Sequence, residues 1–331
     1  MWIFTAALIL FFVLELFYFK IASYFNIIDH PNERSSHSQV TLRGGGVIFP
    51  IAFILGISIW QPSLWLLALA VCFIATISFL DDILTLNNKL RIFIHVLSVL
   101  ILIFQVYLTE TKTATFFLNP YSLLLLPLLL ILIIGIINAY NFMDGINGIT
   151  VLYSITTVIS VWWAQIFNNI YLLDHHIWLL LLAALLAFGF FNVRKKAKAF
   201  AGDIGSISMA LIICFLIAQL MVKTEDLKWI LMLGLYGLDT IATIFCRIIR
   251  KENIFDAHCS HFYQYLANEK KWGHLKIAFS YALIQLALNA LLLYANNMLW
   301  IIAFSFTSIV YIVLRVSLEG RNRLFKKYSA E

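Results

Sequence analysis

The sequence has few charged residues. Asp, Glu, Lys and Arg make up 12% of the 331 residues, whereas hydrophobic types make up 62%, and the mean hydropathy is +0.92. A water-soluble domain of this size cannot bury so much apolar surface, but a lipid bilayer can. The scarcity of charge therefore argues against a soluble enzyme and predicts a membrane protein.

Cysteine is scarce as well. None of the four cysteines, Cys72, Cys214, Cys246 and Cys259, belongs to a CxxC pair. The sequence thus predicts no disulfide framework, and we interpret these side chains as thiols packed in the membrane or facing the cytosol. Low-complexity linkers and internal repeats are absent too, so we expect one integral membrane domain over residues 1–331.

Long apolar runs dominate the chain. About 20 apolar residues span a bilayer as a helix. Eleven such runs are centred near Leu14, Ile54, Ala70, Leu100, Leu129, Thr157, Ala183, Cys214, Leu235, Leu286 and Phe306. The runs near Ile54 and Ala70 are short and joined by a tight hairpin at Gln61-Pro62, and the run near Ala183 is short too. We therefore expect an all-α polytopic membrane protein with about 11 transmembrane helices, or ten.

The first run lacks a basic segment before it and a small-residue cleavage site after it, so we expect a span and not a signal peptide. Glu15 lies inside this run. A carboxyl group within the membrane is a functional candidate, and a neutral or helix-paired Glu15 is the alternative.

Basic residues follow alternate loops. Loops 18–43, 81–91, 192–200 and 246–276 and the tail from Arg315 hold 20 of the 23 Lys and Arg residues. By the positive-inside rule this side is cytoplasmic, which puts the N-terminus in the periplasm and the C-terminus in the cytoplasm. Because the positive charge does not gather on one soluble face, we expect no nucleic-acid partner.

The first two loops on this side carry groups suited to phosphate and metal. Arg34, His37 and Arg43 are donors that suit phosphate, although a basic connector would look alike. Asp81 and Asp82 end a span, and paired carboxylates suit a hard cation. Neighbouring helical residues point about 100° apart, so we expect only one of the two to face a site squarely. The same loop continues with Lys89 and Arg91.

The next two loops carry amides, carboxylates and glycines. One polar helical stripe is predicted because its members recur every three residues: Asn138, Asn141, Asp144 and Asn147. Gly145 and Gly148 beside it permit close approach of another group. Asp203 sits between Gly202 and Gly205 just before a span, where an N-cap and a phosphate site are expected.

The fifth loop contains Asp256, His258, Cys259 and His261. This spacing lacks a fourth zinc ligand at a standard distance, so we do not expect zinc.

In this order, the five clusters resemble the polyprenyl-phosphate N-acetylhexosamine-1-phosphate transferases, and the resemblance covers nearly the whole chain. Its most specific parts are Asp81-Asp82, the NxxNxxDGxxG of 138–148 and the GDxGS of 202–206. It implies an active site on cytoplasmic loops of a multi-pass protein of the bacterial inner membrane.

The resemblance also implies roles for individual residues. Asp81 and Asp82 match aspartates assigned to Mg²⁺ and to the lipid phosphate, and Asp203 matches a direct Mg²⁺ ligand. The remaining matches are Asp144, its amide partner Asn141, His261 at the start of the HxHH segment, and Phe200, an aromatic that stacks on uracil. We expect Arg34, Lys89, Arg91 and His261 to supply positive charge, and Asp81 is our candidate base.

The sequence departs from the pattern in two places, the HxHH segment and position 147. Tyr263 and Gln264 replace the last two histidines of HxHH, as in the O-antigen branch that accepts 6-deoxy sugars such as N-acetylfucosamine or N-acetylquinovosamine. Asn147 stands where the family usually has Asp. An Asn can accept the uracil N3–H and also donate to a ring carbonyl, so recognition of the base is expected to survive.

The implied reaction transfers HexNAc-1-phosphate from a UDP-N-acetylhexosamine, GlcNAc included, to undecaprenyl phosphate and releases UMP. Mg²⁺, or Mn²⁺ in its place, is the expected cofactor, membrane lipids surround the protein, and a homodimer is compatible. The alternatives are a secondary transporter and a lipid-linked-sugar flippase.

Overall fold

Apolar helices make up most of the chain. The structure is a computed structural model that describes residues 2–31, 36, 39–84, 86–109, 120–254 and 258–326. Of the residues singled out in the sequence, Arg34, His37 and Asp256 lie outside these ranges.

The α-helices are α1 (Trp2–Tyr24), α2 (Ile48–Trp60), α3 (Trp65–Leu84), α4 (Asn88–Thr109), α6 (Pro120–Phe142), α7 (Ile149–Phe167), α8 (His175–Asn192), α9 (Gly202–Thr224), α10 (Gly234–Ile249), α11 (Phe262–Asn268), α12 (His274–Tyr294), α13 (Asn297–Glu319) and α14 (Arg321–Phe325). Short 3-10 helices are η1 (Gly45–Val47), η2 (Pro62–Leu64) and η3 (Leu227–Leu233), and the strands are β1 (Ile28–Asp29) and β2 (Thr41–Leu42).

The predicted apolar runs all form helices. Within the described ranges, ten helices are long and apolar enough to cross a membrane, and Gly45–Trp60 is a shorter apolar helix. The run near Ala70 belongs to a span of 23 residues and the run near Ala183 to one of 18 residues, so the run near Ile54 is the short one. The chain is an all-α multi-pass membrane protein, as the sequence predicts.

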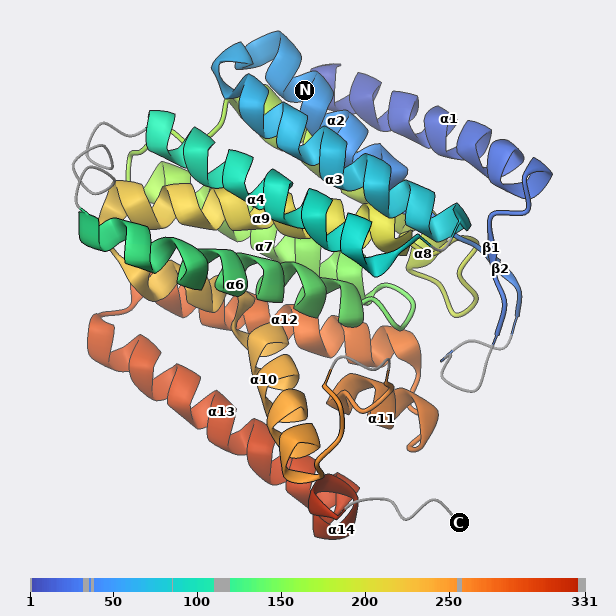
Figure 1. Cartoon of the computed structure of the whole chain (residues 1–331), viewed down its shortest axis with the longest axis vertical. Coiled ribbons are helices and arrows are strands. Elements are labelled where there is room, and N and C mark those ends of the chain that lie inside the picture. The colour runs from blue at the N-terminus through green and yellow to red at the C-terminus, as the bar shows by residue number, and fades with distance from the viewer. Residues whose placement is uncertain are drawn as a thin grey trace.

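Helix α9 forms the centre of the bundle. It contacts α2, α3, α4, α6 and α7, and Figure 1 shows it between these helices. Small residues let the neighbours approach closely, as is common where membrane helices pack. Ser208 of α9 donates to the carbonyl of Ile204 one turn earlier, so its hydroxyl is satisfied inside the apolar interior.

The polar loops gather at one end of the bundle. Figure 1 shows the β1–β2 pair, the α3–α4 turn, the α6–α7 loop and α11 on the same side. The two strands are antiparallel, with Ile28 opposite Leu42, and Leu42 also forms a parallel bridge with Ala199 before α9. The start of α2 and the start of α9 are therefore held together at this end.

The span at Leu227–Ile249 is broken between η3 and α10. Gln285 of α12 accepts a hydrogen bond from the backbone N–H of Leu235 (2.8 Å) and donates one to the carbonyl of Leu231 (2.9 Å). One side chain thus satisfies backbone groups on both sides of the break. Beyond it, α10 runs obliquely to its neighbours toward α14 (Figure 1).

Candidate functional site

Glycines bring two distant loops together at the polar end. The N–H of Gly45 donates to the carbonyl of Phe200 (2.9 Å), and that of Gly46 to the carbonyl of Ala201 (3.0 Å). A Cβ added to Gly205 would lie 2.7 Å from the Cα of Gly46, so the backbones meet without room for side chains. This contact places the segment that carries Arg43 beside the first turn of α9.

Asp82 caps α9. Its carboxylate accepts hydrogen bonds from the backbone N–H groups of Asp203 (3.0 Å) and Ile204 (3.1 Å). The prediction that Asp203 is the N-cap is therefore wrong: Ala201 holds that position, and Asp203 lies in the first turn. Gly202 has φ +72°, and a Cβ there would lie 2.6 Å from an oxygen of Asp82, so the glycine makes room for the cap.

Two arginines join the three aspartates. Arg43 Nε lies 2.7 Å from Asp82 and its Nη2 lies 3.0 Å from Asp203. Arg91 Nη1 lies 2.8 Å from Asp81 and its Nη2 lies 3.7 Å from Asp203. Asp82 contacts α9 directly, whereas Asp81 reaches Asp203 through Arg91, in keeping with the different directions of adjacent helical side chains. We call these five residues the carboxylate–arginine cluster.

The cluster has the donor chemistry of a site for a hard cation, because carboxylate oxygens are the ligands that such ions prefer. In the part of the chain that the structure describes, however, no three His, Cys, Asp or Glu side chains stand ready to hold a metal ion. The arginines occupy the carboxylates instead. The weakest of these contacts is that between Arg91 and Asp203, at 3.7 Å too long for a hydrogen bond.

The polar stripe predicted from 138 to 147 is not one helical face. Helix α6 ends at Phe142, and Asp144 and Asn147 lie in the loop after it. Gly145 and Gly148 explain the early end because glycine disfavours helix, and Gly148 has φ +84°.

The loop nevertheless stays close to the cluster. Asn141 accepts a hydrogen bond from Ser206 of α9 (2.6 Å), and Asp144 accepts one from Thr150 (2.5 Å). Burial raises the pKa of Asp144 to about 7, and the negative charges of Asp203 and Asp82 act in the same direction. Asn138, on α6, is partly buried.

Asn147 holds two loops together. Its side-chain nitrogen donates to the carbonyls of Arg194 (2.9 Å) and Lys195 (3.2 Å), which leaves its carbonyl oxygen as the atom able to accept from a ligand. Phe200 is partly buried beside the Gly45 contact. Lys89 is exposed at the start of α4.

His261 belongs to a second buried cluster that includes a residue the sequence analysis did not single out. Its Nδ1 lies 3.2 Å from Oδ1 of Asp239 on α10, whose side chain is fully buried. The signal for Asp239 was its position inside an apolar span, where a carboxylate is unusual. The two departures from HxHH also make contacts: Tyr263 donates to the carbonyl of Phe142 (2.7 Å), and Gln264 accepts from the N–H of His261 (3.3 Å).

Glu15 is fully buried in α1 beneath Gly45. Neither of its oxygens has a hydrogen-bond partner in the described structure. The alternative of a helix-paired Glu15 is therefore wrong, and an unpaired buried carboxyl favours the neutral form.

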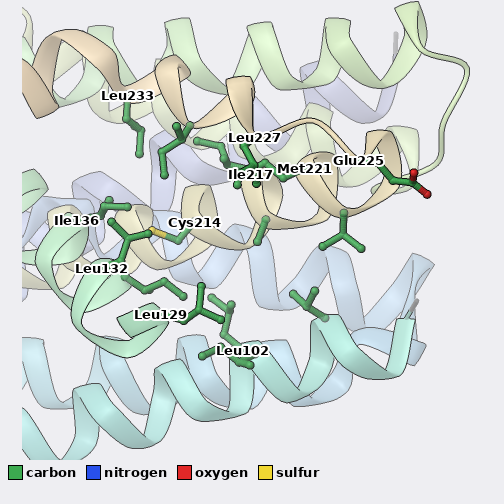
Figure 2. Close-up of a pocket in the computed structure, with 16 residues that line it drawn as sticks. Leu102, Leu129, Leu132, Ile136, Cys214, Ile217, Met221, Glu225, Leu227 and Leu233 are labelled. Carbon is green, nitrogen blue, oxygen red and sulfur yellow. The ribbon is translucent and has the colours of Figure 1, made fainter. Parts of the chain in front are cut away.

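An apolar cavity of about 540 Å³ lies between α4, α6, α9 and η3. Figure 2 shows its lining side chains, with Glu225 at one end and Ile136 near the other. The residues from α9 come from its second half, Cys214 to Val222, so the cavity lies away from Asp203 along the axis of α9. From Asp203 to Cys214 a helix rises about 16 Å.

Residues 64–221 match glycosyl transferase family 4. The match covers nearly half of the chain, which is thus similar to this family. The matched segment contains Asp81, Asp82, Asp144 and Asp203, whereas Arg43, Asp239 and His261 lie outside it.

Three curated relatives have similar sequences. The chain is 32% identical over 185 residues to the phospho-N-acetylmuramoyl-pentapeptide-transferase of Wolbachia pipientis wMel, a match that covers 50% of this chain and 56% of that protein. A probable undecaprenyl-phosphate N-acetylglucosaminyl 1-phosphate transferase of Bacillus subtilis is 27% identical over 258 residues, 75% of this chain and 71% of that protein. A phospho-N-acetylmuramoyl-pentapeptide-transferase of Dictyoglomus thermophilum is 25% identical over 281 residues, 80% and 86%. The chain thus spans little more than half the length of the Wolbachia relative.

Proposed function

We propose that this chain transfers a HexNAc-1-phosphate from a UDP-N-acetylhexosamine to undecaprenyl phosphate. The observation that carries the proposal is Asp203 between Arg43 and Arg91 at the capped start of α9. Guanidinium groups bind phosphate with two parallel hydrogen bonds, and this end of the bundle also carries the positive loops. The names of the relatives support the same reaction class.

Charge neutralisation is the main chemical task of this site. An oxygen of the lipid phosphate forms a bond to the sugar-bearing phosphorus, the bond from that phosphorus to the bridging oxygen breaks, and UMP leaves. Two anions must meet for this to happen, so positioning and positive charge dominate, as in other phosphoryl transfers. Arg43 and Arg91, released from Asp203, would hold the diphosphate, and Lys89 lies on the same turn.

Mg²⁺ is the proposed cofactor, with Mn²⁺ as its substitute. Asp203, Asp82 and Asp81 would hold it, and it would supply positive charge to the diphosphate. Each of these carboxylates is now paired with an arginine. Asp203 would be free to hold the ion if Arg43 or Arg91 turned from the aspartate to the substrate phosphates.

A general base is helpful but not essential. A phosphate monoester loses its second proton near pH 6, so the lipid phosphate is largely ionised at neutral pH. Asp81 remains our candidate base. Its two oxygens accept from the N–H of Leu86 (2.7 Å) and pair with Arg91 (2.8 Å).

The apolar cavity supports a polyisoprenoid acceptor. It lies beside the second half of α9, away from the carboxylate–arginine cluster, and an undecaprenyl chain is long enough to reach it from a phosphate at that cluster. Because the acceptor chain comes from lipid and not from water, van der Waals packing would hold it in the cavity.

The glycan and the sugar are finer proposals. Tyr263 and Gln264 support the O-antigen branch and a 6-deoxy sugar such as N-acetylfucosamine or N-acetylquinovosamine, with GlcNAc as the other candidate. The bacterial inner membrane is the proposed location, with the active-site loops in the cytoplasm.

Release of UMP tests the proposal. Purified protein should release UMP from at least one member of a panel of UDP-N-acetylhexosamines when undecaprenyl phosphate and Mg²⁺ are present, and should release none without the lipid. Transport of a substrate across vesicles with no UMP formed would favour the transporter or flippase instead.

A further inference from the structure

Asp239 is a buried carboxylate for which the proposed reaction has no use so far. It lies on α10 with a fully buried side chain. Five groups contact its oxygens: Phe262 N (3.0 Å), Tyr263 N (3.4 Å), Tyr281 OH (2.6 Å), Thr243 Oγ1 (3.3 Å) and His261 Nδ1 (3.2 Å).

These contacts require a carboxylate. The backbone N–H groups can only donate, and Oδ2 also accepts from Tyr281. Both oxygens of Asp239 accept hydrogen bonds. An Asn at this position would place its NH₂ group, itself a donor, against other donors in either orientation of the amide. A buried charge is retained when it is fully hydrogen-bonded and compensated. Arg315 provides the compensation, with Nη1 3.9 Å from Asp239.

Arg315 comes from α13 and fixes the same corner. Its guanidinium donates to the carbonyl of Ser260 (2.8 Å), to Thr243 (2.9 Å) and to Tyr311 (3.0 Å), and it pairs with Glu319 (2.8 Å). The residue before His261 is therefore held by α13, while His261 itself is held by α10.

The second ring nitrogen of His261, Nε2, does not contact Asp239. This nitrogen is buried and has no hydrogen-bond partner among the described residues. Leaving a buried polar atom unpaired destabilises a protein, so a ligand atom is the expected partner of Nε2. The neighbouring His258 stacks on the ring at 5.1 Å; burial, with the adjacent charge of His261, lowers its pKa to about 3, so it is neutral.

The start of α11 docks on the loop that carries Asp144. Tyr263 donates to the carbonyl of Phe142 (2.7 Å), and the amide nitrogen of Gln264 lies 3.2 Å from the position of a Cβ on Gly145. His261 thereby lies beside the α6–α7 loop. This loop carries Asp144, whose pKa is raised in part by the negative charges of Asp203 and Asp82.

We propose that Asp239 is a positioning residue for His261: its carboxylate accepts from Nδ1–H and so aims Nε2, protonated as well, to donate to a phosphate oxygen of the sugar nucleotide. The role of Nε2 rests on the proposed function; the fixed ring does not. In the imidazolium form both ring nitrogens donate, Nδ1 to Asp239 and Nε2 to the phosphate.

A double-mutant cycle tests the functional link. Asp239→Asn and His261→Asn should each lower kcat on the order of 100-fold, the cost of one lost donor to a developing charge. The double variant should be no worse than either single variant, because both act through one contact. Tyr281→Phe removes a donor from the other oxygen of Asp239 and should change kcat by no more than about twofold. The proposal would be overturned if the kcat losses of the two single variants multiplied in the double variant. It would also be overturned if Asp239→Asn kept full kcat.

A spectroscopic test needs neither activity nor a folded Asp239 variant. In ¹⁵N-histidine-labelled wild-type protein, the resonances that disappear in His261→Asn belong to His261. They should show a proton on Nδ1. A neutral ring with its proton on Nε2 would overturn the positioning role. If Nδ1 is protonated but no UDP-sugar releases UMP, the proposed function fails and the positioning role stands.

Discussion

The carboxylate of Asp82 accepts a hydrogen bond from the backbone N–H of Asp203 at 3.0 Å, although 121 positions separate the two residues. A carboxylate at this place offsets the positive end of the α9 dipole and satisfies its unpaired N–H groups. Because Asp82 supplies the cap, the side chain of Asp203 is directed to Arg43 and Arg91 instead. The capping of α9 and the chemistry of the site therefore depend on one pair of aspartates.

Asp203→Asn should retain the fold and lose most turnover, since it keeps the shape but removes the charge that holds a cation. UMP release against Mg²⁺ concentration measures this. Asp226→Asn is the matched control, because Asp226 caps η3 through an oxygen that the amide retains. Near wild-type turnover of the Asp203 variant in saturating Mg²⁺ would contradict the assignment.

Gly46→Ala should destabilise the protein by about 1–3 kcal/mol through overpacking. The added Cβ would meet the backbone of Gly205, and a backbone cannot rotate away. The thermal midpoint and turnover should both fall, since the contact also places Arg43. Gly135→Ala is the control because its Cβ meets nothing within 4 Å. An unchanged midpoint in Gly46→Ala would show that the two loops can separate.

Asp144 should make stability depend on pH. Burial raises its pKa from 3.8 to about 7. A raised folded-state pKa contributes stability below the unfolded value, and that contribution is lost as pH rises through the folded value. The free energy of unfolding of the wild type should therefore fall from about pH 4 to about pH 7 relative to Asp144→Asn. Thermal midpoints of both proteins across this range test it, and parallel curves would refute the shift.

Asn147→Ala and Phe200→Ala should weaken uracil binding, by roughly 1–3 kcal/mol each. The apparent KM should rise by a similar factor for every accepted UDP-sugar, and inhibition by UMP should weaken. Asn147 also tethers the 194–195 carbonyls, so its variant should lower the thermal midpoint more than Phe200→Ala does. A changed sugar preference with intact UMP inhibition would place the base pocket elsewhere.

The termini should lie on opposite sides of the membrane. With eleven apolar helices among the described residues, counting the short α2, a reporter fused after Glu331 should be cytoplasmic and one placed before Trp2 periplasmic. Fusions active in the opposite compartments would reverse the orientation. Both reporters on one side would mean that one of the eleven apolar helices, α2 being the shortest, does not cross.

Local patterns in the sequence predicted the spans and the polar positions. Apolar length is a property of consecutive residues, and so the helices followed directly. The partners of these positions were not predictable in this way: Arg43 meets Asp82 only because glycines let two loops touch. The stripe to Asn147 failed because a three-residue spacing persists in a loop as well as in a helix. Asp239 was overlooked because its partners come from three other helices.

Gln285 has a mechanical consequence for α10. Gln285 bonds the backbone of Leu231 on one side of the break and of Leu235 on the other, so it makes the break a rigid bend and not a hinge. Tyr153 of α7 in turn donates to Gln285 (2.8 Å), so the side chain of Gln285 is itself held in the interior of the bundle. The direction of α10 is thus set inside the bundle, and with it the place of Asp239, which lies one turn beyond the break.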